Sequence, residues 1–287
     1  MAIITRIVAL AWLLAIQVAT CTAADLHCLW AVKGARNTVY LFGSLHLLPP
    51  GTALPAEVMR AYEGASTVVL EADVTDPTIQ TATLERAMLP AGQTLASALG
   101  PDLYARYAAA AKPLGLDPAL MSAFQPWFAV TMVELAQLAS LGLQPEAGVE
   151  MQVSARAKAD GKRIEGLETV SEQLSLLAGM SMSEQRDFVE SSLEEFADAP
   201  RKPDVLVQAW THGDAKAIDA AGVDAFRAYP ALHRRLVTDR NRRWVGTLAR
   251  LLDERDDYFV AVGVLHLVGR DSVVELLQQR GYTVVQQ

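Results

Sequence analysis

The sequence predicts an α/β protein with a mixed central sheet, built from two strand–Gly-x-x-His–helix–strand units at the chain ends with a large helical insert between them. In the first unit, the stretch "YLFGSLHLLPPG" ends an apolar run at Gly43 and places His46 three residues later. Near the C-terminus, "YFVAVGVLHLVGR" repeats the pattern with Gly263 and His266. The long segment between them is rich in Ala and Leu, with charges at helical spacing.

The residue pattern over positions 1–24 is typical of a signal peptide. Arg6 is the only charge before the apolar run "IVALAWLLAIQVAT", and small residues follow in "CTAAD". We therefore expect cleavage after Ala24, a single mature domain over residues 25–287, and a periplasmic or secreted location. The run is shorter than the roughly 20 residues that cross a bilayer, so no transmembrane span is expected in the mature chain. Cys21 could instead carry a lipid anchor, but Thr directly before it fits that signal poorly.

The first unit follows the leader. "LHCLWAVKGARNTVYLFGSLH" predicts two strands, over residues 26–32 and 38–42, joined by a turn-rich segment as a hairpin. "LPAEVMRAYEGA" has helical spacing and stops at Gly64. "STVVLEAD" is a β-branched run typical of a buried central strand, and Glu71 stands at its end.

The insert covers about residues 77–200. Residues 77–143 predict several helices and no sheet, since Gly and Pro interrupt an Ala- and Leu-rich pattern. "EAGVEMQVSARAKADGK" then predicts an amphipathic helix and "RIEGLE" a short strand. "TVSEQLSLLAGM" predicts a helix with a capping box formed by Thr169 and Glu172, and acidic helices follow.

The second unit closes the chain. A long basic helix is expected over about residues 230–253, followed by the strand "YFVAVG", the helix "DSVVELLQQRG" and the strand "YTVVQ". If the crossovers have the usual right-handed form, the strands of both units lie parallel. His46 and His266 would then emerge at the carboxyl ends of their strands, where open α/β sheets usually bind ligands, and the helical insert would cap that edge.

Composition narrows the function classes. The 25 basic and 33 acidic residues give a net charge of −8, and no segment concentrates Lys and Arg, so no nucleic-acid partner is expected. Hydrophobic residues make up 51% of the chain, which is enough for a sizeable core. Cys28 is the only cysteine after the leader, which excludes an internal disulfide and a thiolate metal cluster.

Two neutral imidazoles and a carboxylate form a typical site for a divalent metal with a position left open for water. We expect His46, Glu71 and His266 to converge as such a site, with Mn, Co and Zn as candidate ions. Whether Glu71 is a ligand or a general base stays open. No HExxH motif is present, so the usual zincin arrangement is excluded. A purely structural interpretation remains, in which the two Gly-x-x-His turns only lock the sheet.

The residue pattern resembles the TraB/GumN family, which includes the Tiki-type metal-dependent proteases. The resemblance is carried by both Gly-x-x-His motifs, "VVLEAD", "GVEMQV", "AKADGKRIEGLET", "DRNRRW" and "FVAVGVLHLVGRDSVVELLQQRGYTV", in order along the whole mature chain. It implies a site centred on His46, Glu71 and His266, with Glu150, Glu168, Arg240 and Asn241 as supporting polar positions.

For the supporting positions we expect different tasks. Glu150 and Glu168 each follow an apolar residue near an element end, where either could orient an imidazole through its second nitrogen. Alternatively, each is an ordinary cap or an exposed charge. Arg240 and Asn241 are candidate substrate-binding residues, because an arginine facing the site could bind a substrate carboxylate or stabilise an oxyanion.

The leading hypothesis is therefore an extracytoplasmic metal-dependent hydrolase, with a Tiki-like protease acting on peptides as the favoured version and a small ester as another possible substrate. The alternative is a non-catalytic protein that binds a peptide, haem or metal in the same cleft. Sequence leaves open the substrate, the metal, the oligomeric state and whether the protein catalyses a reaction at all.

Overall fold

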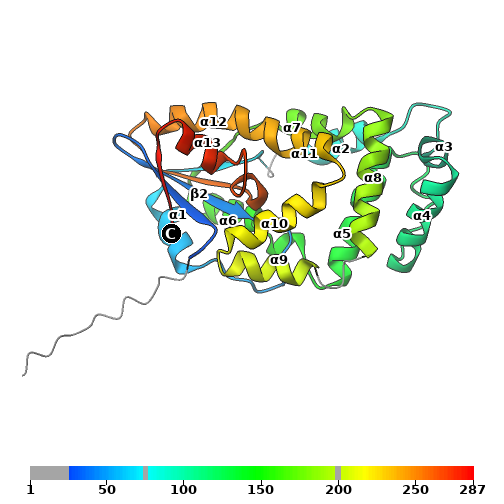
Figure 1. Cartoon of the computed structure of the whole chain (residues 1–287), viewed down its shortest axis with the longest axis horizontal. Coiled ribbons are helices and arrows are strands. Elements are labelled where there is room, and N and C mark those ends of the chain that lie inside the picture. Colours follow the sequence, from blue (N-terminus) through cyan, green and yellow to red (C-terminus); the bar gives the residue numbers. More distant parts are fainter. Residues whose placement is uncertain (1–25, 74–76, 198–201) are drawn as a thin grey trace, which may run out of the picture.

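A computed structural model describes residues 26–73, 77–197 and 202–287. The expected fold class is confirmed: a mixed six-stranded sheet carries helices on its faces and a helical extension at one end (Figure 1). The strands are β1 Leu29–Lys33, β2 Thr38–Ser44, β3 Thr67–Leu70, β4 Arg163–Gly166, β5 Tyr258–Gly263 and β6 Thr283–Gln286.

The sheet has the order β4-β3-β5-β2-β1-β6. Strands β4, β3, β5 and β2 run parallel, and β1 is antiparallel to both of its neighbours, β2 and β6. The two units interleave, because β5 of the second unit lies between β2 and β3 of the first. Ser44 therefore pairs with Gly263, which brings the two Gly-x-x-His motifs to neighbouring strand ends.

Helices cover both faces of the sheet. In Figure 1, α12 and α13 lie above it, and α1 and α6 lie below it. The central strands β3 and β5 are almost wholly buried, as expected for parallel strands covered on both sides, whereas the edge strands β4 and β6 are partly exposed. These four helices are α1 Ala56–Gly64, α6 Val149–Ala159, α12 Asp239–Leu252 and α13 Val273–Gln279.

The remaining helices extend the molecule beyond the sheet. α3, α4, α5 and α8 form the end on the right of Figure 1 and enclose a second hydrophobic core around Leu95, Tyr107, Val133 and Val189. The helices not yet given are α2 Ile79–Ala87, α3 Leu95–Leu99, α4 Pro101–Ala111, α5 Pro126–Ser140, α7 Val170–Ala178, α8 Met182–Ala197, α9 Lys202–Thr211, α10 Ala215–Phe226 and α11 Pro230–His233. Short helical turns are η1 Lys112–Leu114, η2 Pro145–Ala147, η3 Arg234–Thr238 and η4 Val264–His266.

Several local expectations differ in detail from the structure. The hairpin forms, but its first strand begins at Leu29, and its second continues to Ser44. The capping box of Thr169 and Glu172 is present. The long basic helix is interrupted by η3, a π-helical turn, so that α11, η3 and α12 follow one another. Such π-turns are frequent at functional sites, and this one ends two residues before Arg240.

The expected signal peptide, residues 1–24, and Cys21 lie outside the described residues. Within the described ranges, no helix is both long enough and apolar enough to cross a membrane. Cys28 is buried and has a free thiol, as its isolation in the sequence predicts.

Candidate functional site

The structure brings His46, Glu71 and His266 together around Gly263, at the carboxyl ends of β2, β3 and β5. A Cβ atom placed on Gly263 would lie 3.1 Å from Glu71 Oε1, 3.5 Å from His266 Cδ2 and 4.0 Å from His46 Nε2. The Gly263 amide donates a hydrogen bond of 2.7 Å to Glu71 Oε1. A side chain at this position would enter the space that the three groups share, so glycine keeps that space open.

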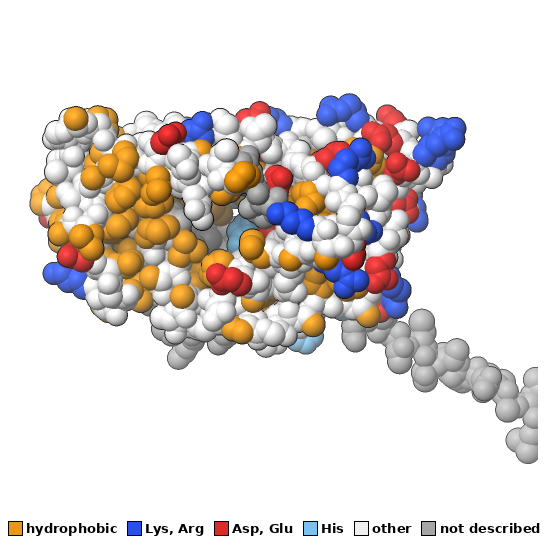
Figure 2. Space-filling view, turned by 180° about the vertical axis from the view of Figure 1, so that it is seen from behind, with side chains coloured by type: hydrophobic (Ala, Val, Ile, Leu, Met, Phe, Trp, Pro, Cys, Tyr) orange, Lys and Arg blue, Asp and Glu red, His pale blue; other side chains and the backbone are white. Residues whose placement is uncertain are grey.

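His46 and Glu71 line an open cavity of about 440 Å³, whereas His266 is buried and does not line it. Figure 2 shows a hollow near the middle of the molecule, with a histidine side chain visible in it. Hydrophobic side chains gather to the left of the hollow, over the helical extension. Both polar and aliphatic side chains line the cavity. The lining includes His46, Glu71, Glu150, Gln173, Arg240, Met151, Leu174, Leu177 and Leu236.

His46 lies at the cavity mouth, with 64% of its side-chain surface accessible. Its Nδ1 is 2.8 Å from Glu150 Oε1, and the Ser44 hydroxyl donates to the same carboxylate. Since an ionised carboxylate only accepts hydrogen bonds, Nδ1 carries the proton and the lone pair of the neutral ring is on Nε2. The expectation that Glu150 orients an imidazole through its second nitrogen agrees with this geometry.

His266 is buried, and its tautomer follows from its two partners. Asn241 Nδ2 donates to the Asp271 carbonyl at 2.9 Å, so that Asn241 Oδ1 faces His266 Nδ1 at 2.6 Å and accepts a hydrogen bond from it. Arg240 Nη1, which can only donate, lies 3.1 Å from His266 Nε2. Both contacts require the proton on Nδ1. Asn241, only 1% exposed, therefore orients His266 in this structure and does not face the cavity.

Arg240 connects the carboxylates of the site. Its Nε donates to both oxygens of Glu168 at 3.1 Å, and its Nη2 donates to Glu71 Oε2 at 2.5 Å and to Glu168 Oε2 at 3.0 Å. Nη1 donates to the Leu236 carbonyl and to His266 Nε2. All five guanidinium N–H groups have acceptors, so Arg240 has no donor left for a substrate unless one of these contacts opens. Glu168 holds Arg240 rather than an imidazole.

The two histidines have opposite pKa shifts. The Glu150 carboxylate raises the pKa of His46 above its ordinary value, and solvent at the cavity mouth limits the shift by screening. Burial lowers the pKa of His266 to about 4, although the nearby Glu71 charge opposes this. Burial also acts to raise the pKa of Glu71, but the charges of His266, Arg240 and His46 outweigh it and bring the value to about 2. Glu71 is therefore ionised and His266 neutral at physiological pH.

The donor types of the trio fit a divalent metal. Each imidazole donates Nδ1–H to an oxygen, as metal-binding histidines usually do, and thereby leaves a lone pair on Nε2. The donor atoms are nevertheless engaged: Arg240 holds His266 Nε2 and Glu71 Oε2, and Gln173 donates to the same Glu71 oxygen at 3.2 Å. Accordingly, no group of three or more His, Cys, Asp or Glu side chains in the described ranges is arranged to hold a metal ion.

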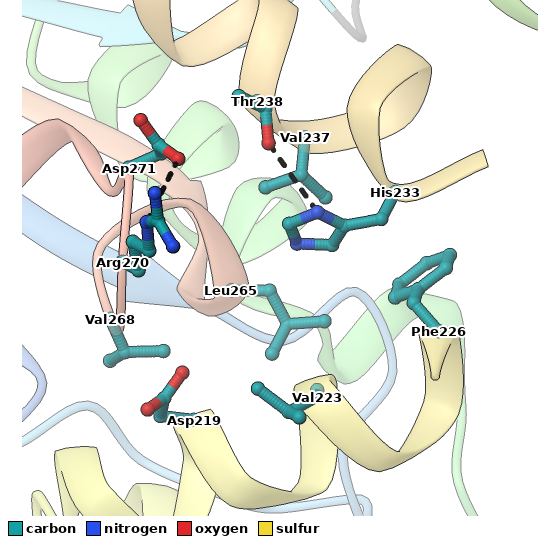
Figure 3. Close-up of a pocket in the computed structure, with 11 residues that line it drawn as sticks. Asp219, Val223, Phe226, His233, Val237, Thr238, Leu265, Val268, Arg270 and Asp271 are labelled. Atoms are coloured by element: carbon teal, nitrogen blue, oxygen red, sulfur yellow. Dashed lines mark hydrogen bonds and ion pairs between the residues drawn. The ribbon is translucent and has the colours of Figure 1, made fainter. Parts of the chain in front are cut away.

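A second cavity of about 240 Å³ lies on the other side of η3. Figure 3 shows Val223, Phe226, His233 and Leu265 pointing toward one another across it. The neighbouring residues Leu236 and Val237 line the first and second cavity, respectively, so η3 separates them. None of the three predicted central residues lines this second cavity, which is why we place the candidate site in the first.

Three polar or aromatic residues of the site were missed by sequence reasoning. Ser44 directly precedes the Leu-His of the first motif, and its contact to Glu150 depends on a helix 106 residues away. Gln173 bonds Glu71 from α7. Trp244 packs on the His266 ring at a centroid distance of 4.4 Å and lies under the Arg240 guanidinium at 4.5 Å. Its position four residues after Arg240, on the same helical face, was the one available signal.

Comparison with known proteins agrees with the family resemblance of the sequence. The model of the TraB/PrgY/gumN family matches residues 28–286. The uncharacterized protein YbaP of Escherichia coli (strain K12) is 25% identical over 240 residues, which cover 83% of this chain and 87% of that protein.

The metalloprotease TIKI1 of Danio rerio is 25% identical over 309 residues, covering 89% of this chain and 62% of that protein. TIKI1 of Homo sapiens is 25% identical over 310 residues, with 89% and 61% covered. This chain thus spans less than two thirds of those metalloproteases. No solved structure matches it significantly.

Proposed function

The chain belongs to the TraB/PrgY/gumN family, and we propose that it is an extracytoplasmic metal-dependent hydrolase that acts on peptides. The observation that carries the proposal is the convergence of His46, Glu71 and His266 around Gly263, beside an open cavity that His46 and Glu71 line, with the Nδ1 atom of each imidazole held by an acceptor. The similarity to proteins described as metalloproteases supports hydrolysis and a metal requirement.

His46 is the residue best placed to move a proton. Its Nε2 lone pair is at the accessible cavity mouth, and Glu150 both fixes the ring and stabilises the imidazolium that forms when Nε2 accepts a proton. The same ring can return that proton to a leaving amine. The arrangement follows the general rule that a catalytic base is oriented by a third group on its other nitrogen.

Glu71 and His266 form the buried part of the site. Because Glu71 stays ionised and His266 stays neutral, neither group binds a proton at neutral pH, and Arg240 occupies their electron pairs in this structure. Glu71 and His266 would hold a divalent ion, with His46 as a third ligand only while its Nε2 carries no proton, and the ion would supply Lewis-acid polarisation of a carbonyl and a more acidic bound water. Trp244 and the aliphatic wall exclude bulk solvent from the inner side.

The test is hydrolysis of a peptide library by the purified mature protein, with and without chelator. We expect His46→Ala and His266→Ala to abolish turnover while circular dichroism remains unchanged. His212→Ala is the matched control, because His212 is exposed in the turn after α9 and its ring bonds the Gln208 carbonyl of that helix. Turnover that survives chelator and both substitutions would refute the proposal. Saturable peptide binding without turnover would instead favour the non-catalytic binding protein.

The proposed location is tested separately. If residues 1–24 direct export, the mature chain should begin at Asp25 and be recovered outside the cytoplasm. Full-length protein that retains its first residues in the cytoplasmic fraction would contradict export without affecting the proposed chemistry.

A further inference from the structure

We propose that Arg240 competes with a divalent cation for the same atoms of the site, so that metal binding requires the guanidinium to leave Glu71 and His266 while it stays bound to Glu168. The inference concerns regulation of the site and rests on the proposed metal dependence. It assigns Arg240 a role different from substrate binding.

The competition follows from which atoms Arg240 contacts. Its Nη2 donates to Glu71 Oε2, and its Nη1 donates to the lone pair of His266 Nε2. These are two of the three donor groups that a metal held by the trio would use. A lone pair that accepts a hydrogen bond from Arg240 is not available to a metal ion. Arg240 thus acts as a positively charged substitute for the metal.

Charge and burial make simultaneous occupancy unfavourable. Arg240 and Glu71 each have 8% of their side-chain surface exposed, so the positive charge lies in a region of weak solvent screening. A divalent ion at Glu71 would be placed directly beside that charge. Two positive charges in contact with the same carboxylate repel each other strongly when water is excluded.

Glu168 offers Arg240 a place to remain. It accepts from Nε and Nη2, so these contacts are separate from the Nη1 contact to His266 and the Nη2 contact to Glu71. The Trp244 ring lies 4.5 Å from the guanidinium carbon and supports the same position. The π-helical turn η3 immediately before α12 is a backbone irregularity at which the start of that helix could adjust.

The test is the affinity for Mn²⁺, Co²⁺ and Zn²⁺, measured by titration calorimetry on the purified mature protein. We expect Arg240→Gln to bind metal about 10-fold or more tightly than the wild type, within the range typical of coupled sites. Arg243→Gln is the matched control. Arg243 bonds the same Glu168 carboxylate at 3.2 Å but is exposed, so its removal should change affinity by less than about 3-fold.

A second variant tests the role of Glu168. Glu168→Gln should weaken metal binding in the wild-type background, because Arg240 then loses its other carboxylate. In the Arg240→Gln background, Glu168→Gln should weaken metal binding by less than about a third of the factor seen in the wild-type background. A similar factor in both backgrounds would mean that Glu168 acts only as a nearby negative charge and not through Arg240. This cycle needs no catalytic activity. Circular dichroism and melting temperature establish that each variant is folded.

The outcomes distinguish the two proposals. Wild-type protein that binds metal, together with an Arg240→Gln variant that binds no tighter, overturns the competition and leaves the proposed function intact. If Arg240→Gln does not fold, unchanged or tighter binding by Glu168→Gln overturns the competition. Absence of metal binding in the wild type and every folded variant overturns both the competition and the metal dependence, whatever the peptide hydrolysis assay shows.

Discussion

Replacing Glu150 with Gln should lower the pKa of His46 without removing the ring from its position. The variant keeps a side-chain oxygen that can accept from His46 Nδ1 at the present 2.8 Å, and the Ser44 hydroxyl can still donate to it. Only the negative charge is lost. The substitution therefore isolates the electrostatic contribution of Glu150 from its role in orienting the ring.

The expected magnitude follows from the distance. Two unit charges 2.8 Å apart interact by about 1.5 kcal/mol in a medium as polarisable as water, which corresponds to about one pKa unit. The mostly exposed ring justifies this screened value rather than one for a dry interior. The pKa of His46 should thus fall by about one unit, toward the ordinary value of 6.5.

The direction in which stability changes with pH follows from the raised pKa of His46. His46 has a higher pKa in the folded than in the unfolded state, so its contribution is fully present below about pH 6.5 and is lost as the pH rises through the folded value. Glu150→Gln should therefore lower the free energy of unfolding by about 1 kcal/mol at pH 6 and have little effect at pH 10.

The assay is an NMR titration of the histidine Cε1 protons in the wild type and the variant, with His27 and His212 as internal controls. The His266 signal should stay in its neutral position above about pH 5.5, because its pKa is held near 4 by burial. If His46 titrates at the same pH in both proteins, within about 0.3 units, the reasoning from the Glu150 charge is wrong.

Three further predictions test the surroundings of the site. Gly263→Ala should reduce activity at least 10-fold with little change in melting temperature, because the added Cβ would enter the space shared by His46, Glu71 and His266. Gly43→Ala should chiefly lower the stability of the fold, because its Cβ would come within 2.6 Å of the Val264 side chain. Buried neutral His266 has a depressed pKa, so stability should fall as the pH drops from about 6.5 through about 4, by up to about 3 kcal/mol; urea unfolding of His266→Gln over this range should show a shallower loss. Cys28 should resist iodoacetamide at pH 8 until urea unfolds the protein, because burial and the neighbouring Asp214 charge raise its thiol pKa to about 12; rapid labelling of the folded protein would contradict this.

The sequence by itself determined the α/β class and the two strand ends that carry the histidines. Both follow from local information: apolar runs define buried strands, and Gly at a strand end permits the sharp turn that places His46 and His266 at the sheet edge. The capping box at Thr169 was likewise predictable, because its partners are three residues apart.

Only the tertiary structure decided how the units combine and which polar groups meet. That β5 inserts between β2 and β3 depends on long-range strand pairing, which no local pattern specifies, and this order is what brings the two motifs together. The N–H groups of Arg240 are all bonded because three distant segments supply acceptors from Glu168, His266 and Glu71. Sequence identifies Arg240 as a charged residue in a basic helix, but its burial and its contacts with Glu71, Glu168 and His266 arise from packing.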